Sequence, residues 1–300
     1  MRLGVDFGGT KIEGALLDSK GEILVRRRVP NPGNYEAAVR AVADLAARIE
    51  QEAGRRAVTV GVGIPGSRSP QTGLVRNANT VWLNGRPFLE DLQKALARPV
   101  RVENDANCFA LSEAVDGSAA GARVVFGVIL GTGCGGGVVV ERKVIEGVNS
   151  IGGEWGHTPL PWPRADEDAG RHWCGRVNCL EQWVSGSGFQ RWSGMSARAA
   201  DEAARSGDAK ARVALDLLAD RLARGLAVVI DILDPDVIVF GGGVSNVEGL
   251  TASVRGKLLA HVFSDVVRTK LVKHVHGDSS GVRGAAWLFE PSGEASEQMQ

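Results

Sequence analysis

The sequence predicts a mixed α/β protein built from two related domains. Three short apolar strands open the chain as an antiparallel meander, strands then alternate with helices, and the opening pattern returns in the second half. The chain has 300 residues, of which 44% are hydrophobic and 23% are charged, so it can form one large or two ordinary domains.

The first half contains the meander and the first strand–helix alternation. Strands are expected over residues 3–7, 12–17, 23–29, 58–64 and 100–103, and helices over about 39–49 and 88–96. Turns follow at Gly8-Gly9, Asp18–Gly21, Pro65-Gly66 and Asn104-Asp105.

The second half repeats the opening. A strand over 124–130 runs into a glycine turn over 131–137, and strands over 138–140 and 143–145 return. After an irregular stretch over 152–179, a long helix is expected that carries Val213, Leu217, Leu222, Leu226 and Val229 on one side and ends at Asp234-Pro235. A buried strand over 237–240 leads into Gly241-Gly242-Gly243.

Small residues cluster at 117–121 and indicate a domain boundary. The first domain is expected over 1–117, with a C-terminal helix over about 281–290 that could pack back onto it. The second domain is expected over 118–290, and the polar segment 291–300 is predicted to be a disordered tail.

Charge and hydropathy exclude several classes of function. The chain has 35 Lys and Arg residues and 35 Asp and Glu residues, so it offers no basic footprint for nucleic acid or an acidic membrane. It shows no signal peptide and no run of ~20 apolar residues, so a soluble cytoplasmic protein is expected. Cys108, Cys134, Cys174 and Cys179 are expected to be reduced thiols or metal ligands.

The glycine turns are candidate phosphate sites, because glycine lets backbone N–H groups approach phosphate oxygens closely. Thr10 and Thr132 add hydroxyl donors, Lys11 adds a positive charge, and Asp6 could hold Mg²⁺ through water. The residues of this candidate site for ATP and Mg²⁺ are Asp6, Gly8, Gly9, Thr10, Lys11, Gly131, Thr132, Gly133, Gly241, Gly242 and Gly243.

Two better-known phosphate loops do not fit these turns. A Walker loop and a Rossmann turn both enter a helix, whereas Lys11 and Gly136 lead into strands. Each turn alone could be an ordinary hairpin, but three glycine turns after strands favour a nucleotide site.

Several motifs together resemble the ROK family of repressors, uncharacterised reading frames and sugar kinases. They lie at 6–11, 103–107, 130–133, 153–157, 174–181 and 241–243, so the resemblance covers nearly the whole chain. Residues 77–85, 155–162 and 276–284 are most similar to bacterial fructokinases with mannokinase activity. The resemblance implies an actin-like (ribonuclease H-like) ATPase fold, with two α/β domains that flank a cleft and close over sugar and ATP.

The resemblance also implies roles for individual residues. Asp105 would act as general base on a sugar hydroxyl, and the sugar would be bound by Gly66, Asn79, Asn104, Asp105, Glu154, His157 and Glu181. From the residues alone, Asp105 could simply cap a helix beginning near Ala106, Asn79 could be a turn residue, and the two glutamates could be solvated surface. Trp155 and Trp183 are expected in the core.

His157, His172, Cys174 and Cys179 are of the right types for tetrahedral Zn²⁺. The family pattern usually has one histidine and three cysteines, and His172 stands here in place of the first cysteine. Four protein ligands leave no open position, so the zinc would be structural and would fix the loop of Glu181. The alternative is two reduced thiols and two surface histidines.

The expected activity is ATP-dependent phosphorylation of a free hexose. D-fructose, giving fructose 6-phosphate, is the first expectation, followed by mannose and glucose. N-acetylhexosamine kinases and glucokinases share these motifs and form the alternative within the family. A sugar-binding sensor without catalytic activity is a hypothesis from a different functional class. A repressor of the same family is not expected, because the phosphate motif begins at Asp6 and the net charge offers no basic surface for DNA. A homodimer is compatible with the family pattern.

Overall fold

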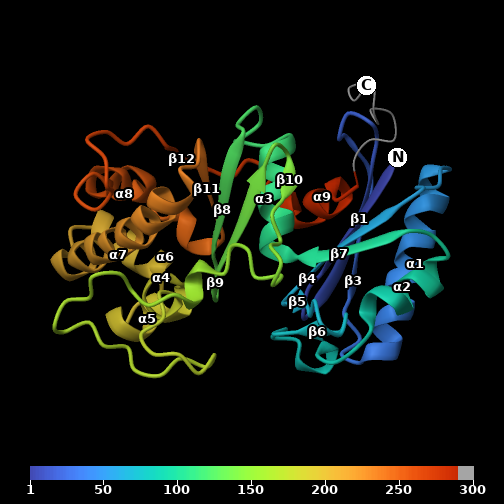
Figure 1. Cartoon of the computed structure of the whole chain (residues 1–300), viewed down its shortest axis with the longest axis horizontal. Helices are drawn as coiled ribbons and strands as arrows, with labels where there is room; N and C mark the ends of the chain where they lie inside the picture. Colours follow the sequence, from blue (N-terminus) through green and yellow to red (C-terminus); the bar gives the residue numbers. More distant parts are fainter. Residues whose placement is uncertain (290–300) are drawn as a thin grey trace. The chain divides into compact units, whose positions relative to one another are not determined.

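The computed structural model describes residues 1–289, which divide into two compact units (Figure 1). Unit 1 contains Met1–Asp116, Glu146–Ile151 and the chain from Asp278 onward, and unit 2 contains Gly117–Ile145 and Gly152–Gly277. The tail predicted over 291–300 lies outside the described residues. No helix within residues 1–289 is both long and apolar enough to cross a membrane.

Unit 1 is built on a five-stranded sheet. Its strands are β1 (Arg2–Phe7), β2 (Lys11–Leu17), β3 (Ile23–Pro30), β4 (Val60–Ile64) and β7 (Val100–Asn104), in the order β3-β2-β1-β4-β7. The first three strands are antiparallel, and β4 and β7 run parallel to β1, as the sequence predicted. The strand expected from residue 58 begins at Val60, because Val58 still lies in an exposed loop (75% exposed).

Helices cover both faces of this sheet. The helices α1 (Tyr35–Ala53) and α2 (Phe88–Leu96) share a hydrophobic core with β1 and β4. The other face packs against α9 (Ser280–Trp287), which also contacts α3 (Asp105–Val115). A Cβ atom at Gly61 in β4 would lie 1.7 Å from the Ala285 carbonyl oxygen, so the backbone of α9 lies directly on the sheet. The shorter elements are β5 (Ser67–Arg68), β6 (Val75–Arg76), η1 (Val81–Leu83) and η4 (Gly277–Ser279).

Unit 2 repeats the same strand pattern. Its strands are β8 (Val124–Leu130), β9 (Cys134–Val140), β10 (Lys143–Val144), β11 (Val237–Gly241) and β12 (Lys270–Lys273), in the order β10-β9-β8-β11-β12. Again three antiparallel strands are followed by two that run parallel to the first. The internal repeat predicted from the sequence is therefore confirmed.

The glycine turn of unit 2 is shorter than predicted. It spans only residues 131–133, because residues 134–137 pair with β8 as the start of β9. Glycine is needed inside this strand for a tertiary reason: a Cβ atom at Gly136 would lie 2.6 Å from the Gly153 carbonyl oxygen and 2.7 Å from Trp155. The segment that leads into η2 (Trp155–His157) therefore packs directly on β9.

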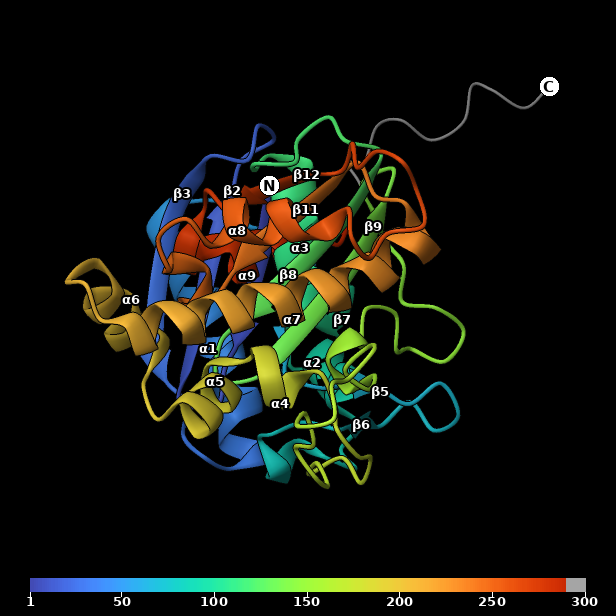
Figure 2. The same cartoon turned by 90° about the vertical axis from the view of Figure 1, so that its left-hand side faces the viewer.

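The remaining elements of unit 2 are helical. They are α4 (Glu181–Val184), α5 (Gly186–Ser193), α6 (Ala197–Arg205), α7 (Ala209–Leu233), η3 (Gly243–Asn246) and α8 (Leu250–Leu258). The long helix α7 crosses the unit (Figure 2) and shares its core with β8 and β11. Asp234 ends it in a left-handed conformation before Pro235, as predicted. Val213 is not on the buried side, since it is 60% exposed and Ala211 and Ala214 take the buried positions there.

Candidate functional site

The first glycine turn follows β1 in unit 1 and is fixed through its carbonyl groups. The Gly8 amide donates to the Lys11 carbonyl at 2.9 Å. Asn31 donates from its side chain to the Gly8 carbonyl at 2.8 Å and from its backbone to the Thr10 carbonyl at 3.0 Å. Gly9 and Thr10 are exposed, so the turn predicted to meet phosphate presents backbone to solvent.

Asp6 lies at the end of β1, opposite Glu13 on β2. The start of α9 packs against it, since a Cβ atom at Gly281 would lie 3.1 Å from Asp6 Oδ2. Burial, reinforced by the charge of Glu13, raises the pKa of Asp6 to about 6, against the opposing effects of Lys11 and Arg28. Asp6 is therefore a part-buried acid beside the exposed turn, which suits a cation ligand.

Asn104 and Asp105 lie where β7 gives way to α3. Asn104 is the helix cap: its Oδ1 accepts from the Ala106 amide at 2.9 Å, and its Nδ2 donates to the Gly66 carbonyl at 2.9 Å. Asp105 is exposed as the first helical residue, and its Oδ1 also accepts from the Ala106 amide at 2.8 Å. The alternative in which Asp105 serves as the N-cap is therefore wrong, because Asn104 occupies that position.

Gly66 connects this helix start to the loop of Asn79. It has a φ of +79°, and a Cβ atom there would lie 2.4 Å from the Arg76 carbonyl oxygen and 2.7 Å from the Ala78 nitrogen. The side-chain amide of Asn84 holds Ala78 through two hydrogen bonds of 2.9 Å, and the neighbouring Asn79 is exposed. Unit 1 therefore links Gly66, Asn104 and the Asn79 loop.

Glu103 is a residue of this site to which the sequence analysis gave no role. It is buried, and it accepts hydrogen bonds from the Asn104 amide at 2.7 Å and from Asn107 Nδ2 at 3.0 Å. Burial and the nearby carboxyl group of Glu146 raise its pKa. Glu103 thus fixes the backbone beside Asp105 from within the unit, and its place in the 103–107 motif was the available signal.

The glycine turn of unit 2 is also fixed through backbone groups. The Gly186 amide donates to the Gly131 carbonyl at 2.7 Å, and Ser187 Oγ donates to the Thr132 carbonyl at 2.6 Å. Both donors belong to the first turn of α5. A short helix that the sequence analysis did not predict therefore fixes the predicted phosphate turn.

The third glycine segment lies against the second. Gly242 has a φ of +80°, and a Cβ atom there would lie 2.5 Å from the Leu130 carbonyl oxygen and 2.9 Å from the Gly131 nitrogen. Gly241 ends β11, and Gly243 begins η3 with no atom near its would-be Cβ. Unit 2 therefore brings the predicted segments 131–133 and 241–243 together.

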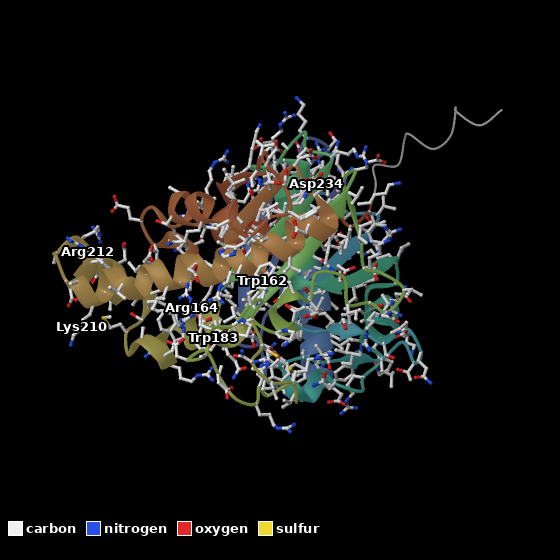
Figure 3. The ribbon with its side chains drawn as sticks, turned by 60° about the vertical axis from the view of Figure 1, so that its left-hand side comes forward. Trp162, Arg164, Trp183, Lys210, Arg212 and Asp234 are labelled. Carbon is white, nitrogen blue, oxygen red and sulfur yellow. The ribbon has the colours of Figure 1, made fainter. Side chains whose placement is uncertain are left out.

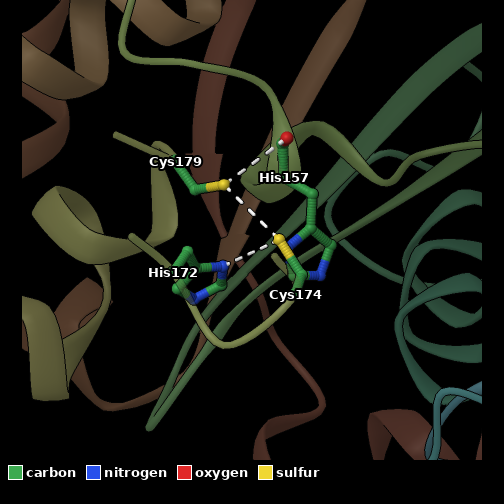
Figure 4. Close-up of side chains that lie close together, drawn as sticks. All are labelled: His157, His172, Cys174 and Cys179. Carbon is green, nitrogen blue, oxygen red and sulfur yellow. Dashed lines mark hydrogen bonds between the residues drawn. The ribbon is translucent and has the colours of Figure 1, made fainter. Parts of the chain in front are cut away.

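The four candidate metal ligands converge in unit 2 (Figure 4). Their ligand atoms all lie within 4.8 Å of one another. His172 Nδ1 lies 3.1 Å from Cys174 Sγ, and the sulfur atoms of Cys174 and Cys179 are 3.6 Å apart. His157 Nδ1 is buried and has no hydrogen-bond partner among residues 1–289.

The separation of the two sulfur atoms is close to that in tetrahedral zinc sites, and the other ligand atoms lie near enough to adjust around an ion. Bonds of ~2.3 Å to sulfur and ~2.0 Å to nitrogen place neighbouring ligand atoms about 3.3–3.8 Å apart. A metal would satisfy the buried His157 Nδ1, and His172 could bind through Nδ1 because its Nε2 lies 2.9 Å from Glu181 Oε1. Two histidines and two cysteines are therefore a suitable ligand set.

The two predicted sugar-binding glutamates differ in their surroundings. Glu181 begins α4, and besides His172 it accepts from Trp173 Nε1 at 2.9 Å and from the Cys134 amide at 2.8 Å. Glu154 precedes η2, and its Oε2 lies 3.8 Å from His157 Nε2. The cluster, the glycine turn and both glutamates thus form one connected part of unit 2.

Buried ion pairs hold the loop that carries this cluster against α7. Figure 3 labels Trp162 and Arg164 of this loop beside that helix. Glu167 accepts from Arg221 at 2.8 Å and from Arg224 at 2.7 Å. Burial alone would raise the pKa of Glu167, but hydrogen bonds from Arg224, Arg221 and the Arg164 amide lower it to about 2. Trp183 is buried and packs on Arg221, so its expected place in the core is confirmed, and Trp155 is buried as well.

Comparisons with known proteins agree with this architecture. A sequence model described as the ROK family matches residues 2–292. The N-acetyl-D-glucosamine kinases of Shigella boydii and Vibrio parahaemolyticus are 38% and 39% identical to the chain, and each match covers 96% of this chain and 99% of the relative.

Solved structures show the same fold. A ROK hexokinase from Thermus thermophilus matches with a TM-score of 0.85 and 32% identity, over 96% of this chain and 97% of its own. A ROK family glucokinase from Streptomyces griseus, in complex with glucose and AMPPNP, matches with a TM-score of 0.76 and 28% identity, over 95% and 97%. Together with the repeated sheet order, these matches confirm the predicted actin-like ATPase fold.

Replacing Asp6 with asparagine is predicted to stabilise the protein at neutral pH. Because folding raises the pKa of Asp6 from 3.8 to about 6, the folded chain binds this proton more tightly, and stability falls as the pH rises from about 4 to about 6. Asp6→Asn should therefore raise the free energy of unfolding by about 1–3 kcal/mol at about pH 7.5 and by little at about pH 4.

Urea unfolding at both pH values measures this difference. Asp44→Asn is the matched control, because it makes the same chemical change at an exposed position of α1. An Asp6→Asn protein no more stable than this control at neutral pH would contradict the burial argument.

Proposed function

Since the chain belongs to the ROK family, we propose that it is an ATP-dependent sugar kinase that phosphorylates N-acetyl-D-glucosamine. The similarity to N-acetyl-D-glucosamine kinases along 96% of the chain carries this proposal. It was the alternative expected from the sequence. Fructose, the first expectation, is not confirmed, because the relatives and structures named above are described as N-acetyl-D-glucosamine kinases, a hexokinase and a glucokinase.

Glucose is the second candidate substrate. It is favoured by the fold match to the glucokinase of Streptomyces griseus, whose structure holds glucose and AMPPNP. The sequence identity to that protein is 28%, against 38% for the N-acetyl-D-glucosamine kinase, so glucose ranks second.

The nucleotide is proposed to be bound by the three glycine turns. The turn at 131–133 and the segment 241–243 lie together in unit 2, and the turn at 8–10 is exposed beside Asp6 in unit 1. Asp6 is a part-buried acid whose pKa is raised by burial. It would hold Mg²⁺, which supplies positive charge to the phosphates of ATP.

Asp105 is proposed to be the general base. As the 6-hydroxyl oxygen of the sugar bonds to the γ-phosphorus, the bond from that phosphorus to the β–γ bridging oxygen breaks and ADP leaves. The hydroxyl proton passes to the carboxylate of Asp105. Asp105 is exposed, and Asn104 and Glu103 hold the backbone beside it, which supports this role.

The polar groups that the family resemblance implies are proposed to bind the sugar. Asn79 and Asn104, with the backbone of Gly66, offer amide donors and carbonyl acceptors in unit 1. The unit 2 residues are Glu154, His157 and Glu181, whose carboxylates accept from sugar hydroxyls. A structural Zn²⁺ held by the four-residue cluster would fix His157 and, through His172, Glu181. The cytoplasmic location and the homodimer expected from the sequence stay predictions.

A panel of sugars tests the proposed substrate. With ATP and Mg²⁺, we expect kcat/KM for N-acetyl-D-glucosamine to exceed that for glucose, mannose and fructose by about 10-fold or more, because a site built around one polar substituent rejects sugars without it. ADP release measured by a coupled assay gives these values. A preference for glucose would favour the second candidate, and a preference for fructose would restore the first expectation.

Asp105→Asn should lower kcat by about 10²–10⁴-fold, since the variant keeps the shape but cannot take the proton. The Kd for the sugar should stay within a few-fold. Asp208→Asn is the matched control, because Asp208 caps α7 by accepting from the Lys210 and Ala211 amides and should not affect turnover. Near-normal turnover in folded Asp105→Asn protein would remove Asp105 from the mechanism.

Metal analysis tests the zinc site in protein purified without a histidine tag. About one equivalent of zinc per chain is expected, with large losses in His172→Ala and Cys174→Ser. His261→Ala is the control, because His261 lies outside the cluster and should leave the zinc content unchanged. Full activity with less than about a tenth of an equivalent would exclude the site.

A further inference from the structure

Trp173 is an exposed tryptophan that is nevertheless held in place. It lies between the cluster residues His172 and Cys174, and it is 70% exposed. Its indole Nε1 donates to Glu181 Oε1 at 2.9 Å. Its ring stands edge-on to His157, with centroids 5.2 Å apart at 86°, and tilts against His172 at 5.3 Å. Three directed contacts with candidate functional residues distinguish it from an incidental surface side chain.

The hydrogen bonds of Glu181 show what this contact does. A carboxylate has about four lone-pair sites. On Oε1, one is used by Trp173 Nε1 and one by His172 Nε2, and on Oε2 one is used by the Cys134 amide at 2.8 Å. Among the interactions within residues 1–289, this leaves one acceptor site on Oε2 for a substrate hydroxyl.

We propose that Trp173 is a positioning residue for sugar binding. Its N–H fixes the carboxylate plane of Glu181, so that Oε2 presents its remaining acceptor site in one direction. Without this donor, only His172 would hold Oε1, and the terminal torsion of a glutamate is broad. The inference rests on the proposed function, because it takes Glu181 to be a sugar ligand.

Trp173→Phe tests the inference, because it keeps an aromatic ring at this position and removes the N–H donor together with the second ring of the indole. We expect the KM and the calorimetric Kd for N-acetyl-D-glucosamine to rise about 10-fold, the loss expected when a misdirected Glu181 carboxylate forfeits about one hydrogen bond to a sugar hydroxyl. The KM for ATP, the zinc content and the melting temperature should stay close to those of the unmodified protein.

Trp162→Phe is the matched control. Trp162 is also exposed (54%) and lies in the same loop, but it stacks on His261 and so should not alter sugar binding. In a Glu181→Gln background, Trp173→Phe should weaken sugar binding by less than about 2-fold, because the carboxylate it positions is absent.

The outcomes separate the two proposals. If the unmodified protein binds none of the sugars in the panel, the proposed function and this inference both fail. If it binds and phosphorylates a sugar but Trp173→Phe binds that sugar as tightly, only the inference is overturned. Loss of zinc in Trp173→Phe, or a full effect in the Glu181→Gln background, would also overturn it, since Trp173 would then act on the loop and not through Glu181.

Discussion

Direct backbone contact between α9 and its neighbours is the constraint on which unit 1 depends. A Cβ atom at Gly61 would lie 1.7 Å from the Ala285 carbonyl oxygen, and one at Gly284 would lie 1.6 Å from the Cys108 carbonyl oxygen. The helix thus packs on β4 and on α3 with no side chain in between, which only glycine permits. Because α3 begins at Asp105, and a Cβ atom at Gly281 would lie 3.1 Å from Asp6 Oδ2, both candidate acids lie beside elements that this helix packs on.

Unit 2 combines close backbone packing with a polar connection. Glu181 joins the loop of the His/Cys cluster to Cys134, the residue directly after the turn at 131–133. Gly133 leaves room for it, because a Cβ atom there would lie 2.8 Å from Glu181 Oε2. Ser187 fixes the same turn from α5. The groups proposed to meet phosphate and those proposed to meet sugar are therefore parts of one hydrogen-bonded framework.

Local patterns in the sequence predicted most of the fold. The turn at Gly8-Gly9, the repeat after Leu130 and the stop at Asp234 were found because each depends on a few neighbouring residues. The extent of β9 could not be predicted from local patterns. Glycine is needed at position 136 of this strand because Gly153, which is distant in the sequence, packs against it. The helices α5 and α6 had a local signal that was not used, because Ser185 and Ser196 cap them through their side chains.

The sequence predicted which residue types form the candidate site, but it did not predict the contacts between them. Sequence motifs pointed to Glu181 and His172, yet only the structure shows that they touch each other and Trp173. His172 stands where the family pattern has a cysteine, and this difference would also change the net charge of a metal complex beside the Glu181 carboxylate. A divalent ion with two thiolates and two neutral imidazoles has no net charge, whereas a third thiolate would make the complex an anion. Glu181 would then border an electrically neutral group and would meet no repulsion from a negatively charged metal complex.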